Sequence, residues 1–162
     1  LDAAQPVLRA APIEYVINTH ADGDHCWGNQ FFRDKHIIGT QACVDQMHHL
    51  RPQTLHALKH GGRVLRRLPF TRLDKFGHYM AGMFAPYDFR DIAITPPNDA
   101  FRGKRVLQVG QTEVHLLEVG PGHTDGDAIV HVPEQGVAYA GDILFVGVTP
   151  VMWAGPLVKR SV

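Results

Sequence analysis

The sequence predicts an α/β fold in which sheets and helices form separate layers. Two short runs before residue 41 are typical of strands, and four more follow residue 103, bounded by glycine and proline. Between them the apolar residues recur at helical spacing. Since 162 residues suffice for one sizeable core, we expect a single domain over residues 1–162, with a helical insert at roughly 41–90.

The strands are expected at the apolar, β-rich runs. The run IEYVINT ends at a polar turn, and HIIGT follows it after a stretch long enough for one helical turn. In the second region PEQG reads as a hairpin turn between the last two strands. We therefore expect strands at 13–19, 36–40, 104–110, 112–120, 128–133 and 136–145.

The middle of the chain predicts three helices. Cys43, Met47 and Leu50 lie at helical spacing, and the pair Gly61-Gly62 is expected to close a second helix. In the third helix one stripe collects apolar side chains, which we interpret as a core face. The residues of this stripe are Leu73, Phe76, Met80, Met83 and Phe84.

The composition narrows the class of protein. Lys+Arg and Asp+Glu number 16 each, so no net positive field is available to bind a nucleic acid. No apolar run approaches the roughly 20 residues of a membrane span, and no signal peptide is visible. Cys26 and Cys43 are too few for a disulfide framework. We expect a cytoplasmic protein that binds neither nucleic acid nor membrane.

Polar loops follow three of the predicted strands and carry histidine and aspartate. The first runs from His20 to His25, the second contains His123 within GPGHTDGD, and the third contains Asp142 within AGDILF. Loops at the ends of strands along one sheet edge are where α/β folds place their functional sites. We expect these three loops to meet.

The spacing within the first loop suits metal ions. Side chains two apart in an extended segment point the same way, so His20 and Asp22 can share one ion. Asp24 and His25 lie just beyond, in a turn that a glycine loosens, and can address a second ion. Zinc accepts imidazole and carboxylate ligands together, and a carboxylate such as Asp142 can bridge two ions.

The three loops, in this order, resemble the motifs of the metallo-β-lactamase superfamily of metal-dependent hydrolases. The resemblance extends over residues 13–145. That family's motif His-x-His-x-Asp-His stands here as HADGDH, its Gly-His-Thr turn is matched by Gly122-His123-Thr124, and its Gly-Asp by Gly141-Asp142.

The resemblance implies an αββα sandwich and a site with two ions, zinc in the first instance. By this resemblance Asp24 also orients or deprotonates the attacking water, and a metal-bound hydroxide cleaves an ester, thioester, lactone or amide. The helical insert is expected to act as a lid if it does not face the core, which favours a small-molecule substrate with an apolar acyl or aromatic group. The ligands implied are His20, Asp22 and His123 for one ion, and Asp24, His25 and Asp142 for the other.

The chain departs from the family pattern in two ways. Asp22 replaces the motif's second histidine, which makes an ion less Lewis-acidic and widens the choice to iron or manganese. No histidine follows His131, although the family has one after its bridging aspartate, and the opening strands are reduced to residues 1–12. Both ends therefore look clipped, and unfinished sheet edges favour a partner, such as a second copy.

Other interpretations stay open. An iron-dependent oxygenase or a natural-product cyclase can use the same scaffold, and a truncated non-catalytic subunit is a third possibility. Residues outside the three motifs have simpler interpretations. His56 and His60 are expected at the surface or in the lid, Asp125 and Asp127 as turn formers, and Cys26 as a packing residue.

Overall fold

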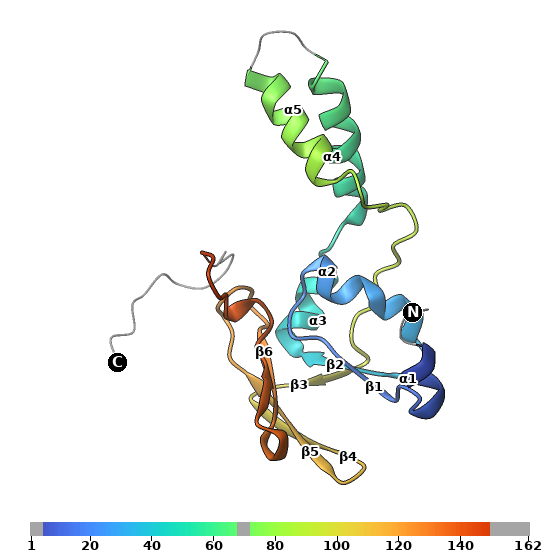
Figure 1. The fold of residues 1–162 in the computed structure, drawn as a ribbon, viewed down its shortest axis with the longest axis vertical. Helices are drawn as coiled ribbons and strands as arrows, with labels where there is room; N and C mark the ends of the chain where they lie inside the picture. The colour runs from blue at the N-terminus through green and yellow to red at the C-terminus, as the bar shows by residue number, and fades with distance from the viewer. Residues whose placement is uncertain (1–4, 68–71, 150–162) are drawn as a thin grey trace, which may run out of the picture. The chain divides into compact units, whose positions relative to one another are not determined.

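A computed structural model describes residues 5–67 and 72–149 (Figure 1). The chain forms two compact units, which we describe separately. The sheet unit comprises Leu1–His49 with Ile94–Val162, and the helical unit comprises Leu50–Ala93. The helix at 41–47 belongs to the sheet unit, although the sequence grouped it with the insert.

The first sheet is parallel and contains three strands, in the order β1 (Tyr15–Ile17), β2 (His36–Thr40) and β3 (Asp99–Phe101). The strands expected at 13–19 and 36–40 are present, the first of them shorter. We did not predict β3, because three residues behind a pair of prolines carry no visible alternation.

The second sheet is antiparallel, and its strands follow one another in chain order. The four strands expected here are present. The last is shorter than expected because the chain turns at Gly141, where φ is +54°. The strands are β4 (Lys104–Val109), β5 (Thr112–Glu118), β6 (Ala128–Val132) and β7 (Val137–Tyr139); short 3₁₀ turns η3 (Pro133–Gln135) and η4 (Gly141–Ile143) follow β6 and β7.

The two sheets share one hydrophobic core. Ile38 and Phe101 of the first sheet pack with Leu116 and Val130 of the second. Leu116 is fully buried, and burying a side chain of this size stabilises the fold by about 1.5–3 kcal/mol. The predicted layered α/β arrangement is confirmed. The shared core fixes the position of the loops of one sheet relative to those of the other.

Short helices complete the sheet unit. In α3 (Gln41–Met47) the Thr40 hydroxyl accepts a hydrogen bond from the Cys43 amide at 3.0 Å and so caps the first turn. This helix ends earlier than the residue 50 that we expected. The others are α1 (Gln5–Ala10), α2 (Gly23–Cys26) and the 3₁₀ helix η2 (Trp27–Phe32).

The helical unit is a hairpin of α4 (Pro52–Leu65) and α5 (Arg72–Met83), which lie side by side in Figure 1. The prediction that Gly61-Gly62 closes the helix is wrong, because α4 continues through both glycines. A Cβ on Gly62 would lie 3.0 Å from the Ala81 nitrogen, and one on Gly77 only 2.4 Å from the Arg66 nitrogen. The glycines therefore let the two backbones pack closely.

The apolar stripe of α5 is not a core face along its whole length. Met80 is buried, but the side chains of Leu73, Phe76 and Met83 are exposed. The reason is that the small residues Gly77 and Ala81 already occupy the contact with α4. The role of this stripe as a lid stays a prediction.

None of the helices within the described ranges is long and apolar enough to cross a membrane.

Candidate metal centre

The first loop leaves the end of β1 and is held in place by a buried pair of asparagines. Asn18 and Asn29 donate to each other's side-chain oxygens at 3.1 and 2.7 Å. Asn18 also donates to the carbonyl of His25, and Asn29 to the carbonyl of Thr95 at 2.9 Å. The pair closes the loop around α2, so the side chains between them have a defined direction.

Within this loop the backbone changes from extended to helical at Asp22. The Asp22 residue is extended (φ −68°, ψ 146°), and its carbonyl accepts from the amides of His25 and Cys26. As the sequence predicted, His20 and Asp22 point the same way, with 4.0 Å between Nε2 and Oδ2. Asp24 and His25 lie on the helical turn that follows.

His20 is buried, with 1% of its surface exposed. Its Nδ1 lies 3.0 Å from the hydroxyl of Thr19, and its Nε2 has no hydrogen-bond partner among the described residues. Burial, and then the neighbouring His25, lower the pKa of His20. Burial thus favours the neutral form of the imidazole, and its Nε2 faces the other polar side chains.

The second loop brings in His123, which is also buried. The carboxylate of Asp127 accepts the Thr124 amide at 3.0 Å and the Thr124 hydroxyl at 2.7 Å, which fixes the turn beside the histidine. The amide of Ala128 donates to the carbonyl of Thr19 at 2.7 Å and so joins this turn to the first loop. The structure supports the interpretation of Asp127 as a turn former.

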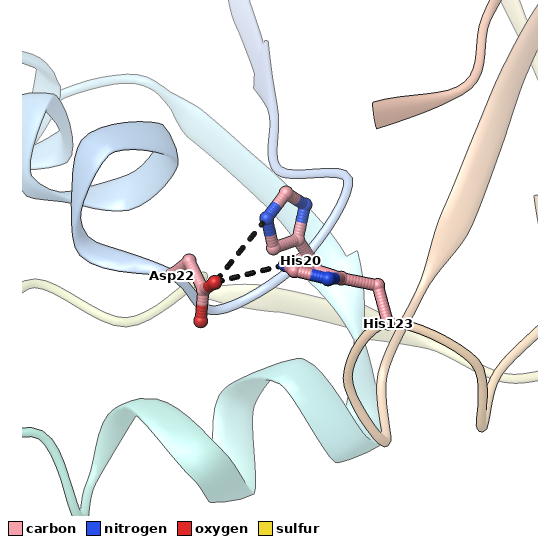
Figure 2. Close-up of side chains that lie close together, drawn as sticks. All are labelled: His20, Asp22 and His123. Atoms are coloured by element: carbon pink, nitrogen blue, oxygen red, sulfur yellow. Dashed lines mark hydrogen bonds and ion pairs between the residues drawn. The ribbon is translucent and has the colours of Figure 1, made fainter. Parts of the chain in front are cut away.

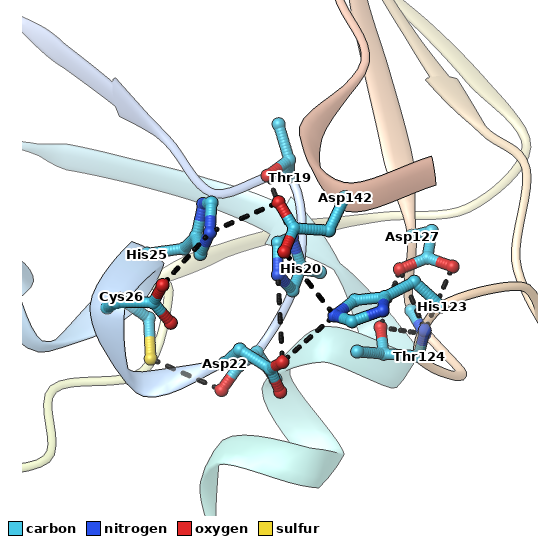
Figure 3. Close-up of polar contacts among 12 residues, drawn as sticks. Thr19, His20, Asp22, His25, Cys26, His123, Thr124, Asp127 and Asp142 are labelled. Carbon is cyan, nitrogen blue, oxygen red and sulfur yellow. Dashed lines mark hydrogen bonds and ion pairs between the residues drawn. The ribbon is translucent and has the colours of Figure 1, made fainter. Parts of the chain in front are cut away.

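The third loop places Asp142 between two histidines (Figure 3). Its carboxylate oxygens lie 3.4 Å from Nε2 of His25 and 3.7 Å from Nε2 of His123. The loop approaches the first one closely at Gly141, where a Cβ would lie 2.8 Å from the Thr19 hydroxyl and 3.3 Å from Nδ1 of His20. A glycine is needed there both for space and for the positive φ.

These side chains form two overlapping groups of potential metal ligands. His20, Asp22 and His123 are one group (Figure 2), with 2.9 Å between Nε2 of His123 and Oδ2 of Asp22. His20, His25 and Asp142 are the other. We refer to these five residues as the His–Asp cluster.

Asp24 lies at the edge of the cluster. Its side chain is 79% exposed, and its Oδ2 lies 3.5 Å from Nε2 of His25. The structure thus brings together the first set of three ligands that the resemblance implied. The second group in the structure contains His20 together with His25 and Asp142, whereas the resemblance implied Asp24 as the third ligand.

The donor set fits a divalent cation. Asp22 and Asp142 bring two carboxylates against the imidazoles of the cluster, so the cluster attracts positive charge. The Nε2 of His20 is a buried polar atom without a hydrogen-bond partner among the described residues, and such atoms require an explanation. Imidazole nitrogen and carboxylate oxygen are ligands for zinc and for iron.

The residues that support the cluster carried no sequence signal of their own. Thr19, Asn18 and Asn29 orient the ligands but belong to no spacing that points to a metal. Cys26 behaves as expected for a packing residue, since its thiol is buried and donates to the carbonyl of Ala21 at 3.3 Å. Burial raises the pKa of the Cys26 thiol to about 12.

Comparisons with known proteins agree with this picture. The family model of the metallo-β-lactamase superfamily matches residues 3–159. No curated protein matches the chain. Among solved structures, the crystal structure of the BLEG-1 B3 metallo-β-lactamase is similar, with 17% identity and a TM-score of 0.50 over 90% of this chain and 58% of that one. The chain therefore spans a little over half of that protein, and the likeness concerns the fold.

Proposed function

Because the chain belongs to the metallo-β-lactamase superfamily, we propose that it hydrolyses an ester, thioester, lactone or amide of a small molecule. Its two sheets and helices match the metallo-β-lactamase fold, and membership supports a metal-dependent hydrolase-type function. The observation that carries the proposal is the His–Asp cluster, in which residues more than 100 positions apart converge on one point.

We assign two ions to the cluster. His20, Asp22 and His123 would hold the first, and His25 and Asp142 the second, with Asp24 beside them. Zinc suits this donor set, and the carboxylate of Asp22 admits iron or manganese as well. When bound, such ions lower the pKa of water and polarise a carbonyl oxygen.

The residues of the chain have separate tasks in this proposal. Thr19 keeps the Nε2 of His20 directed into the cluster. Asp142 lies between His25 and His123 and sets the distance between the two ligand groups. Asp24 is exposed and close to His25, so its carboxylate can accept a proton from a water molecule at the edge of the cluster.

A hollow beside the cluster supports an apolar substrate group. It has a volume of about 350 Å³ and lies within the sheet unit. Its walls come mainly from apolar side chains, while His25 is shared with the cluster. Sites of this size and lining bind small organic molecules, which favours an apolar acyl or aromatic group. The lining residues are Ile17, Thr19, His25, Val130 and Tyr139.

The proposal is tested by turnover of a panel of activated esters, thioesters, lactones and β-lactams after loading with zinc, iron or manganese. We expect hydrolysis of at least one class, and a kcat about 10²–10⁴-fold lower in Asp24→Asn. Asp34→Asn is the matched control, because Asp34 is an exposed carboxylate that pairs with Lys35 and does not belong to the cluster. Full metal content without turnover of any compound would contradict the proposal and indicate a non-catalytic subunit.

One observation favours a second candidate, an iron-dependent oxygenase. Each group in the cluster consists of two histidines and one aspartate, and this donor set occurs in non-haem iron oxygenases as well as in hydrolytic zinc sites. Iron in the purified protein together with consumption of oxygen would favour the oxygenase. Zinc with hydrolysis would favour the first proposal.

We further propose a cytoplasmic location, which two buried free cysteines suit.

A further inference from the structure

A second group of histidines lies in the helical unit. Its charged neighbours are mainly basic side chains, whereas those of the His–Asp cluster are carboxylates. His56, Lys59, His60 and Arg63 occupy positions i, i+3, i+4 and i+7 of α4, so they share one helix face. Asp88 and Arg90 come from the segment after α5. Together the six residues line a hollow of about 530 Å³, which we call the basic hollow.

Hydrogen bonds join the segment after α5, which lines the basic hollow, to α4. The ammonium of Lys59 donates to the carbonyls of Ala85, at 3.2 Å, and of Tyr87. The carboxylate of Asp88 accepts from Nε and Nη2 of Arg90, and also from the Arg90 amide at 3.1 Å. These contacts build the hollow before any ligand arrives, which lowers the ordering cost of binding.

The charges in the basic hollow do not cancel. Lys59, Arg63 and Arg90 contribute three positive charges against one negative charge from Asp88, a net of +2, in a chain whose formal net charge is zero. Asp88 is already paired with Arg90. The guanidinium of Arg63 forms no hydrogen bond or ion pair with other residues that the structure describes, so its donors remain available.

The positively charged side chains of the basic hollow also act on His60. The rings of His56 and His60 are close together, with 4.4 Å between their centroids. Partial desolvation, and then the neighbouring side chains of His56 and Arg63, lower the pKa of His60. An anion between these groups would relieve the repulsion, whereas a cation would add to it.

We propose that the basic hollow is a binding site for a small molecule that carries a phosphate or sulfate group. A guanidinium offers a planar pair of donors that matches the oxygens of such an anion, and the ring N–H of a neighbouring imidazole can donate as well. The volume lies in the range of small-molecule sites and leaves room for an organic part beyond the anionic group. This site does not depend on the proposed hydrolase function.

The test is calorimetric titration of the full chain with inorganic phosphate and with pyrophosphate at low ionic strength. We expect saturable binding, and an affinity about tenfold lower in Arg63→Gln and in His60→Gln. In the unaltered protein the imidazole resonances should show that phosphate raises the pKa of His60. The groups that face it are His56, Lys59, Arg63, Asp88 and Arg90.

Two controls separate the basic hollow from other sources of binding. Arg67→Gln removes an exposed arginine that does not line the hollow, and His20→Ala removes a ligand of the His–Asp cluster. Both variants should bind phosphate as the wild type does.

Three results would overturn the proposal. They are the absence of saturable binding, an equal loss of affinity in Arg67→Gln, and zinc binding abolished by His60→Gln but not by His20→Ala. The last result would make the histidine pair a cation site instead.

Discussion

Two regions of this chain gather histidines, and they are suited to ligands of opposite charge. In the His–Asp cluster the imidazoles of His20 and His123 are buried, and the charged partners near them are carboxylates. In the basic hollow the imidazoles of His56 and His60 stand among lysine and arginine side chains at the surface. The neighbours of a histidine, rather than the histidine itself, therefore decide whether its site attracts a cation or an anion.

The largest effect on stability and metal affinity is expected from a substitution that removes the support of the second loop. Asp127→Ala removes the carboxylate that accepts the amide and hydroxyl of Thr124 and leaves these buried donors unpaired. We expect a loss of about 2–3 kcal/mol in the free energy of unfolding and a metal affinity about 10–100-fold lower. Denaturant unfolding and metal titration measure the two effects.

Asp125→Ala is the control, since Asp125 is exposed and accepts one hydrogen bond from Gln46. It should change the unfolding free energy by less than about 1 kcal/mol. Equal effects of the two substitutions would show that the Asp127 turn does not position His123.

A substitution in the helical unit should affect the basic hollow alone. A Cβ at Gly77 would lie 2.4 Å from the Arg66 nitrogen, so Gly77→Ala must push α4 and α5 apart at a cost of about 1–3 kcal/mol. We expect lower helix content by circular dichroism and weaker phosphate binding, with unchanged metal content.

In the control Gly82→Ala the new Cβ meets no atom within 4 Å, so the helix should be as stable or slightly more stable. Loss of metal in Gly77→Ala would show that the two sites are not independent.

A smaller effect on stability and metal binding is expected at Gly141, which allows the third loop to approach the His–Asp cluster closely. Gly141→Ala adds a side chain at φ +54° and within 3 Å of Thr19. The left-handed backbone alone costs about 1–2 kcal/mol, and the displaced Asp142 should weaken the binding of the second ion. Metal titration by calorimetry would show a lower stoichiometry.

Gly28→Ala serves as the comparison, because a Cβ there meets open space and φ is not positive. If both variants bound metal alike, the close approach at Gly141 would not govern the position of Asp142.

The smallest effect concerns an ion pair in the sheet unit. Two hydrogen bonds from Arg105, at 2.6 and 2.7 Å, lower the pKa of Asp99. A lowered carboxylate pKa adds stability above the unfolded value near 3.9, and this stability is lost as the pH falls through the folded value. Because both side chains are about one-third exposed, we expect only about 0.5 kcal/mol.

Arg105→Gln should therefore flatten the pH dependence of unfolding between about pH 5 and the folded pKa of Asp99, and leave the stability below that folded pKa unchanged. Arg90→Gln removes one partner of the exposed Asp88–Arg90 pair and should lower phosphate affinity rather than stability. A larger acid sensitivity in Arg105→Gln than in wild type would refute the role of this pair.

Much of the fold follows from patterns that act over short distances. Period-two alternation in β6 buries Ala128, Val130 and Val132, and this regularity is visible in the sequence. The strand β3 and the course of α4 through Gly61-Gly62 were not predicted, because both depend on a partner element. β3 exists through its pairing with β2, and Gly62 is tolerated because α5 packs against it.

The His–Asp cluster was more accessible to prediction than its supports. Three motifs named the side chains that converge, because a metal site requires particular residue types at particular spacings. The Asn18–Asn29 pair was missed because a hydrogen bond across 11 residues leaves no periodic trace, and Thr19 because a contact with the adjacent His20 belongs to no metal-ligand spacing. The basic hollow was likewise missed, because Arg90 reaches it only through the turn after α5.

The central claim is that the neighbours of each histidine group decide its ligand, and metal content per chain tests it most directly. Mass spectrometry of wild type, His20→Ala, Asp142→Ala and His60→Ala would follow loading with zinc, iron or manganese and removal of the excess. We predict about one to two equivalents in wild type and in His60→Ala, and less in His20→Ala and Asp142→Ala. No bound metal in wild type, or loss of metal in His60→Ala but not in His20→Ala, would contradict the account.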